Sequence, residues 1–145
     1  MMSEKILISA CLAEFNCKYS GGNNLSEDVR KLYESGRAVP VCPEQLGGLS
    51  TPRRCSEIRD GRVFDTEGND VTEYFEAGAL KALAVCRKNG CQKAILKEGS
   101  PSCGTRWIYD GTFSHTRIPG RGIFAAMLEQ EGTELMNEEE YGGEI

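Results

Sequence analysis

Seven cysteines are the most chemically versatile residues of this 145-residue chain, which holds only one histidine. Small secreted domains use such a number of thiols as disulfide staples, but the odd count and an apolar fraction of 39% do not fit that use. In a reducing cytosol, several thiols more often bind a metal or a cluster, or take part in catalysis. We therefore expect a cytoplasmic protein in which only some of the seven thiols are functional.

Four of the cysteines lie beside turn residues or at the ends of apolar runs typical of strands: Cys11, Cys17, Cys42 and Cys103. Cys11 follows the first apolar run, Cys42 ends the second, and Cys103 comes six residues after the third. In a parallel sheet, ligands bind beyond the carboxyl ends of the strands. We therefore expect Cys11, Cys42 and Cys103 to converge at one edge of the sheet, and Cys17 to lie in a polar turn that folds back over it.

The other three cysteines are assigned to packing or left outside the site. Cys86 falls inside a long helical pattern and Cys91 follows its end, where a free cysteine behaves as a small hydrophobic residue. Cys55 lies next to Arg53 and Arg54, whose charges could lower the pKa of its thiol. Because its predicted loop is not at the strand-end edge, we do not include Cys55 in the site.

A site made only of thiolates allows two kinds of metal centre. Four thiolates would close a structural zinc site or complete an iron–sulfur cluster. Three would leave one iron of a [4Fe-4S] cluster open as a Lewis acid for a soft sulfur from a substrate. The spacing of Cys11 and Cys17 is not that of a zinc knuckle or a ferredoxin, and His115 is expected to be an exposed loop residue. The spacing alone does not decide between three and four thiolate ligands.

One carboxylate and several hydroxyl groups lie next to these thiols in the sequence. Glu44 closely follows the second strand-end cysteine, where its carboxyl group would suit a general acid or base. Ser100 and Ser102 precede the last of these cysteines and can donate hydrogen bonds to a sulfide, a water or a substrate carbonyl. We favour a functional role for Ser100 and a turn role for Ser102, and we expect Ser9 at the same edge.

The elements that would position these residues alternate between strand and helix. Compact apolar runs predict strands at residues 5–10, 38–42, 93–97 and 133–137. Apolar periodicity and end signals predict helices at residues 26–36, 72–90 and 121–132. Buried strands separated by helices imply right-handed crossovers. We therefore predict an α/β fold, a Rossmann-like three-layer α/β/α sandwich with a mainly parallel sheet of about four strands, in a single domain over residues 1–145.

Local signals add detail to this prediction. Ser26 and Thr72 are expected to cap two of the helices, and Pro40 favours an edge position or a strand end. The pair Asp60-Gly61 marks the turn of an irregular hairpin over residues 54–68. The acidic segment 138–145 is expected to fray.

The charge of the chain limits its partners. A formal net charge of −5 makes it a poor candidate for tight, salt-driven binding to nucleic acid. A local group of arginines, which includes Arg53 and Arg54, favours a small anionic or polar ligand. No apolar run approaches the roughly 20 residues of a membrane span, so we expect no membrane partner.

Several longer motifs occur in an order that resembles one bacterial domain family. They are "SACL", "NCKYSGG", "VPVCPEQLGGLSTPR", "EGNDVTEYFEAGA", "AILKEGSPSCG" and "IYDGTFS". The combination of "CPEQLGG", "SPSCG" and "YDGTF" is highly specific, and the motifs cover nearly the whole chain. On these motifs the chain resembles the thiouracil desulfidases of the TudS type and the related thiouridine desulfidases.

This resemblance implies an enzyme that holds a [4Fe-4S] cluster through only three cysteines. The fourth iron would take the sulfur of a thiolated pyrimidine base or nucleoside, and water would replace that sulfur on the ring without net redox. By motif, the cluster ligands would be three cysteines: Cys11, Cys42 and Cys103. Cys17 would be the alternative ligand, and Glu44 and Ser100 would position and activate the water.

Two other classes of protein remain open at this point. A metal-binding or iron–sulfur-binding module that stores or senses without catalysis would use the same thiols. A thiol oxidoreductase ranks last, because it would need a C-x-x-C pair and the chain has none.

Overall fold

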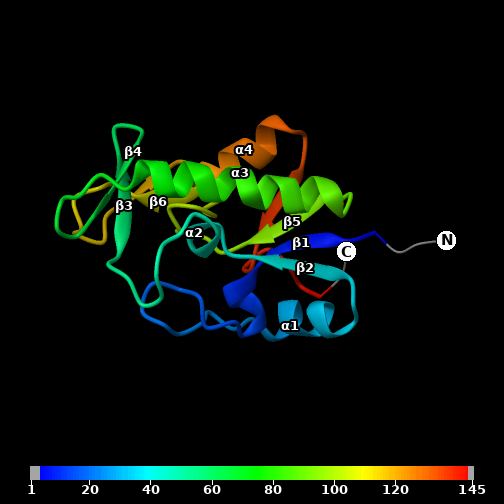
Figure 1. Ribbon diagram of the computed structural model, residues 1–145. Coiled ribbons are helices and arrows are strands. Elements are labelled where there is room, and N and C mark those ends of the chain that lie inside the picture. Colours follow the sequence, from blue (N-terminus) through cyan, green and yellow to red (C-terminus); the bar gives the residue numbers. More distant parts are fainter. Residues whose placement is uncertain (1–3, 144–145) are drawn as a thin grey trace.

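The computed structural model describes residues 4–143, and four parallel strands form its central sheet (Figure 1). The strands are β1 (Ile6–Ser9), β2 (Ala38–Val41), β5 (Lys93–Leu96) and β8 (Glu134–Asn137). Their order in the sheet is β2–β1–β5–β8, so all four predicted strands are present. As predicted, the strand with Pro40 lies at the edge, where a residue without an N–H group is tolerated.

Helices cover both faces of the sheet, which confirms the predicted three-layer arrangement (Figure 1). They are α1 (Glu27–Glu34) on one face, and α3 (Thr72–Lys88) and α4 (Ile123–Gln130) on the other. Along β1, Ile6 and Ile8 join the core with α1, while Leu7 joins the core with α3 and α4. Because both faces are covered, the strands appear in the sequence as continuous apolar runs. No helix within residues 4–143 is long and apolar enough to cross a membrane.

The helix ends follow the predicted signals with one exception. The Ser26 hydroxyl caps α1 by accepting a hydrogen bond from the backbone N–H of Val29 (3.4 Å), and Asn89 caps the carboxyl end of α3. The prediction that Thr72 caps α3 is wrong, because Thr72 is the first residue inside the helix. Its buried hydroxyl instead accepts a hydrogen bond from the backbone N–H of Val63 (2.9 Å), which ties α3 to a hairpin.

Several smaller elements lie beyond the carboxyl ends of the strands (Figure 1). The hairpin of β3 (Ser56–Arg59) and β4 (Arg62–Asp65) turns at Asp60-Gly61, as predicted. The elements that the sequence did not predict are the 3₁₀ helix η1 (Ala10–Ala13), the short helix α2 (Pro43–Leu46), and the hairpin of β6 (Trp107–Tyr109) and β7 (Arg117–Pro119). Each of these has only three or four residues, which is too few to show a period.

The acidic segment after β8 is packed against the fold, so the prediction that it frays is wrong for residues 138–141. Tyr141 is only 5% exposed and belongs to the core on the α1 face. The Asn137 side chain accepts hydrogen bonds from the backbone N–H groups of Glu139 (2.9 Å) and Glu140 (3.0 Å). The buried aromatic ring anchors an otherwise polar segment. Residues 144–145 of the predicted frayed segment lie outside the described residues.

Two glycines allow α2 to lie directly against α3. A Cβ atom on Gly78 of α3 would lie 1.8 Å from the carbonyl oxygen of Pro43, and one on Gly47 would lie 2.0 Å from that of Tyr74. Neither position has room for a side chain, because real Cβ contacts do not fall below 3.0 Å. This close backbone contact fixes the position of α2, the helix that carries Glu44.

We predict that Gly78→Ala destabilises the protein and displaces α2. Helix propensity alone would favour alanine over glycine by about 0.8–1 kcal/mol. The clash with Pro43 should reverse this sign and cost about 1–3 kcal/mol, as overpacking usually does. Chemical denaturation measures the free energy of unfolding, with Gly142→Ala as the control because nothing lies within 4 Å of its Cβ position. A Gly78→Ala protein at least as stable as the parent chain would contradict this prediction.

Candidate active site

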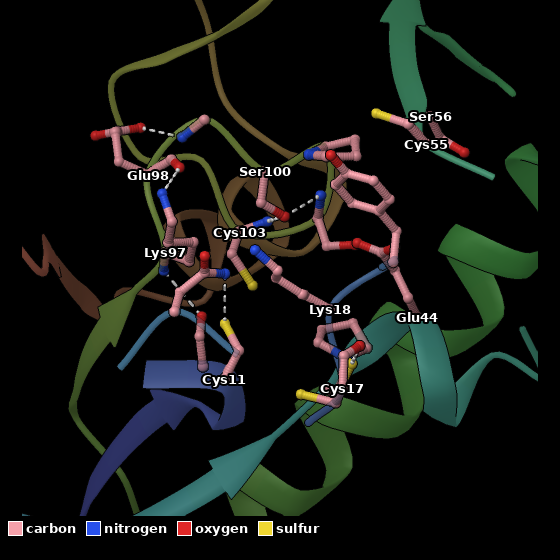
Figure 2. A pocket seen from close by; sticks show the side chains of 18 of the residues that line it. Cys11, Cys17, Lys18, Glu44, Cys55, Ser56, Lys97, Glu98, Ser100 and Cys103 are labelled. Atoms are coloured by element: carbon pink, nitrogen blue, oxygen red, sulfur yellow. Dashed lines mark hydrogen bonds between the residues drawn. The ribbon is translucent and has the colours of Figure 1, made fainter. Parts of the chain in front are cut away.

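A cavity of about 320 Å³ opens beyond the carboxyl ends of β1, β2 and β5 (Figure 2). In the sheet, β1 lies between β2 and β5, so the strand order reverses direction at β1. Such a switch point is the usual ligand site of an open α/β sheet. The cavity has the size of a small-molecule site.

Three of the predicted cysteines meet at this cavity. Cys11 lies in η1 after β1, Cys42 follows β2 directly, and Cys103 lies in the loop after β5. Cys17 lines the same cavity. The structure brings these thiols together because parallel strands end at the same edge of the sheet. In the sequence, Cys11 and Cys103 are 92 positions apart. By contrast, Cys86 and Cys91 pack in the core on the α3 face, as predicted.

Cys17 is buried beside two of the other thiols. Its side chain hydrogen-bonds with those of Cys11 and Cys42, and its carbonyl oxygen accepts a hydrogen bond from the Cys42 thiol (3.7 Å). The hydrogen bond with Cys17 lowers the pKa of Cys42 to about 7, aided by the backbone N–H of Gln45. The hydrogen bond with Cys17 also lowers the pKa of Cys11, whose Sγ accepts a further bond from the Asn24 amide (3.3 Å). Contacts with the Cys11 and Cys42 side chains, together with burial, raise the pKa of Cys17 itself.

Cys103 lies next to Ser9, the polar residue that the sequence placed at this edge. Burial raises the pKa of the Cys103 thiol, and a hydrogen bond with the Ser9 side chain opposes that effect. Ser9 is 3% exposed, and its hydroxyl accepts a hydrogen bond from the backbone N–H of Lys97 (2.9 Å). Ser9 therefore connects the end of β1 with both the end of β5 and the thiol.

Cys55 also lines the cavity, which corrects its exclusion from this edge of the sheet. It immediately precedes β3, and the hairpin folds back over the strand ends so that Cys55 and Ser56 border the cavity (Figure 2). The expected direction of its pKa shift is wrong as well. Burial, followed by the negative charges of Glu57 and Glu44, raises the pKa of the Cys55 thiol. The side chain of its neighbour Arg54 is 58% exposed and lies near Asp65 (4.0 Å) and Glu67 (3.9 Å).

Glu44 lines the cavity with both of its carboxylate oxygens engaged. Oε1 accepts a hydrogen bond from Nε of Arg53 (3.0 Å), and Oε2 accepts one from the hydroxyl of Ser102 (3.1 Å). The side chains of Arg53 and Glu44 are only 7% and 15% exposed. The guanidinium of Arg53 also donates to the carbonyl oxygen of Cys17 (2.9 Å). Arg53 therefore joins the carboxylate on α2 to the cysteine loop after η1.

Ser100 and Ser102 make contacts that differ from the roles expected of them. The hydroxyl oxygen of Ser100 accepts hydrogen bonds from the backbone N–H groups of Ser102 (3.1 Å) and Cys103 (3.0 Å), which is a turn role. Ser102 is 1% exposed, and its hydroxyl contacts Glu44. Ser100 also lines the cavity, and its own O–H remains able to donate there. The contact of Ser102 was not predicted because 58 positions separate it from Glu44.

Glu98 organises the loop that carries both serines and Cys103. It is 2% exposed, and its carboxylate accepts hydrogen bonds from the backbone N–H groups of Thr105 (2.8 Å) and Arg106 (3.1 Å) and from the amide of Asn137 (2.7 Å). Burial raises the pKa of Glu98, but hydrogen bonds from Arg106, Thr105 and Gly99 hold it below its ordinary value. The sequence reasoning missed Glu98, and the available signal was a carboxylate directly after a buried strand.

Aromatic residues of the β6–β7 hairpin form part of the cavity wall. The rings of Trp107 and Tyr109 pack edge to face, with centroids 5.2 Å apart. His115, in the loop between the two strands, is exposed as predicted, but it also borders the cavity and packs against Tyr109. Glu57 holds this loop by accepting a hydrogen bond from the backbone N–H of Gly111 (3.0 Å). Such a wall suits a planar ring.

The donor atoms of the cavity suit an iron–sulfur cluster better than a single metal ion. Thiolates are the usual ligands of such clusters, and the cysteines that border the cavity are free thiols. In the part of the chain that the structure describes, no three His, Cys, Asp or Glu side chains lie close enough to hold one metal ion. A cluster does not require that arrangement, because each thiolate binds a different iron atom.

Comparison with known proteins agrees with this geometry. A family model described as 2-thiouracil desulfurase matches residues 6–140. The solved structure of a [4Fe-4S]-dependent thiouracil desulfidase, TudS, is 40% identical and similar in fold, with a TM-score of 0.89 over 94% of this chain and 92% of that one. The protein YbbK of Bacillus subtilis (strain 168), described as uncharacterised, is 43% identical in an alignment that covers 93% of this chain and 96% of YbbK. The chain therefore belongs to the 2-thiouracil desulfurase family of enzymes, which confirms the resemblance seen in the motifs.

We predict that Cys42 is the first thiol to be alkylated in reduced, metal-free protein. With a pKa of about 7, about half of the Cys42 side chains are thiolate at pH 7, and this fraction falls as the pH drops below 7. Among the cysteines of the cavity, Cys17 and Cys103 should react last, because both are buried and have raised pKa values. Brief labelling with iodoacetamide between pH 6 and pH 8, followed by peptide mass spectrometry, measures the order. Protein unfolded in guanidinium is the control, and labelling of Cys17 before Cys42 in folded protein would contradict the prediction.

Proposed function

We propose that the protein is a hydrolytic desulfidase for a thiolated pyrimidine base or nucleoside, such as thiouracil. The observation that carries the proposal is a carboxylate, Glu44, in the same cavity as three thiols from the ends of three strands. In the reaction, water adds to the thiocarbonyl carbon and the C–S bond breaks. The ring gains oxygen, hydrosulfide leaves, and no net electrons are transferred. Membership of the family and the similarity to TudS support this chemistry.

The cofactor in this proposal is a [4Fe-4S] cluster held by three thiolates. The proposed ligands are Cys11, Cys42 and Cys103, which follow the ends of β1, β2 and β5 and border the cavity, with Cys17 as the alternative. When bound, the cluster would supply an iron without a protein ligand, a Lewis acid with affinity for the sulfur of the substrate. The description of TudS as [4Fe-4S]-dependent supports the same cofactor.

Glu44 is the proposed general base. Its carboxylate borders the cavity and can take a proton from the attacking water. Arg53 and Ser102 each hold one of its oxygens, so the carboxylate is oriented before a substrate binds. Both partners are shielded from bulk water, which strengthens these contacts.

Ser100 is the proposed hydroxyl group that orients the water or the substrate. Its oxygen is fixed by the backbone N–H groups of Ser102 and Cys103. Because these bonds occupy the lone pairs of the oxygen, the O–H is left to donate to a ligand in the cavity. Ser100 thus acts as a donor, while Ser102 acts through Glu44.

We further propose that residues 1–145 act as one domain in the cytoplasm. The seven cysteines are free thiols, and free thiols persist in a reducing compartment. The net charge of −5 favours a small substrate over a polynucleotide.

Glu44→Gln should lower kcat for sulfide release from 2-thiouracil by about 10²- to 10⁴-fold, the usual contribution of a general base. Glutamine keeps the shape of the side chain but does not accept the proton, so the iron content should not change. Sulfide release under anaerobic conditions measures the effect, with the exposed Glu67→Gln as the matched control. Full activity of Glu44→Gln would contradict the role of Glu44. Absence of sulfide release by iron-loaded parent protein would contradict the proposed function.

Serine in place of any one of the three proposed ligands should remove most of the bound iron and the visible absorption of the cluster. Cys11→Ser, Cys42→Ser and Cys103→Ser each take away the thiolate of one iron. Cys86→Ala is the control, because Cys86 packs in the core away from the cavity. Iron analysis and the absorption spectrum of anaerobically reconstituted protein measure the result. If Cys17→Ser loses the cluster while one of the three variants keeps it, Cys17 replaces that cysteine in the ligand set.

A further inference from the structure

Three cationic side chains border the cavity, and two of them have anionic partners. Arg53 pairs with Glu44 at 3.0 Å. Lys97 pairs with Glu138 at 3.1 Å and donates to the carbonyl oxygen of Glu98 at 2.8 Å. The third cation is Lys18, which is half-buried.

The ammonium group of Lys18 differs from the other two cations in its surroundings. Within residues 4–143, the ammonium group has no hydrogen-bond acceptor and no ion-pair partner. In Figure 2 its side chain extends into the cavity, toward the loop that carries Ser100 and Cys103. A half-buried cation without a protein partner is available to a polar or anionic atom of a ligand.

The backbone that carries Lys18 is held in place on both sides. The N–H of Lys18 donates to the carbonyl oxygen of Gly22 (3.2 Å), and its carbonyl oxygen accepts from the N–H of Gly21 (2.9 Å). Arg53 holds the neighbouring residues, through the carbonyl oxygens of Cys17 (2.9 Å) and Tyr19 (2.7 Å). The backbone around Lys18 is therefore held in place, while its ammonium group has no partner among the described residues.

We propose that Lys18 binds the carbonyl oxygen that remains on the thiolated pyrimidine ring. This inference rests on the proposed function, because a thiouracil ring carries one exocyclic sulfur and one exocyclic oxygen. The thiols and Glu44 account for the sulfur and the water. Among residues 4–143, the other two cations that border the cavity, Arg53 and Lys97, already have anionic partners. The lysine thereby selects rings with a carbonyl group and orients the thiocarbonyl carbon toward Glu44.

Uracil and two analogues that each lack one of its carbonyl groups test this role. Uracil has two carbonyl oxygens, whereas pyrimidin-2-one and pyrimidin-4-one each have one. The cluster-loaded parent protein should bind uracil about tenfold or more tightly than at least one of the two analogues, because a charge-assisted hydrogen bond is lost. Anaerobic equilibrium dialysis measures the dissociation constants without any turnover.

Lys18→Met should reduce this preference to less than about twofold, because methionine keeps the length of the side chain but donates no hydrogen bond. Lys18→Arg should retain part of the preference, and Lys81→Met, on the exposed face of α3, should retain all of it. A chemical double-mutant cycle of this kind isolates the contact between one side chain and one ligand atom.

Two outcomes would overturn the assignment of Lys18. One is an unchanged preference for uracil in Lys18→Met. The other is an equal loss of affinity for uracil and both analogues, which would assign the lysine to another part of the ligand. The binding data are independent of sulfide release: a protein that binds uracil through Lys18 but releases no sulfide from 2-thiouracil supports this inference and contradicts the proposed function.

Discussion

Parallel alignment of β1, β2 and β5 is the constraint on which the site depends. The three strands pair in register over the same short stretch, so the segments that follow them leave the sheet at one edge. Cys11, Cys42 and Cys103 are the residues that this alignment delivers to the cavity. The close contact of α2 with α3 at Gly78 then sets the distance of Glu44 from these thiols. Backbone geometry, rather than any single side-chain contact, thus assembles the candidate active site.

Arg53 connects the two polar halves of this site. One side chain contacts the carboxylate of Glu44 and the carbonyl oxygen of Cys17, and its backbone N–H binds the carbonyl oxygen of Tyr19. The same residue therefore positions the proposed base and the loop of Lys18. Removing Arg53 would leave the largely shielded carboxylate of Glu44 without its cation, so Arg53 contributes to stability as well as to orientation.

The fold and the thiols were predictable from the sequence, but the contacts between the loops were not. Strands buried on both faces leave continuous apolar runs, and a cysteine after such a run is placed at the strand end by topology alone. The prediction that Cys55 lies away from the site is wrong, because its position depends on how the β3–β4 hairpin folds back over the sheet. The partners of Glu44 and Glu98 were missed for the same reason, since Ser102 and Asn137 approach them from distant parts of the chain. The local pattern of residue types in the sequence contains no information about such tertiary contacts.

The central claim is that this cavity replaces the sulfur of a thiolated pyrimidine with oxygen from water. The most direct test is anaerobic turnover of 2-thiouracil in ¹⁸O-labelled water without any electron donor or acceptor, with mass spectrometry of the pyrimidine product and quantification of sulfide. We expect each uracil formed to carry one ¹⁸O atom, with one sulfide released for each uracil. Product without the label, or a reaction that proceeds only when an electron donor or acceptor is added, would contradict it.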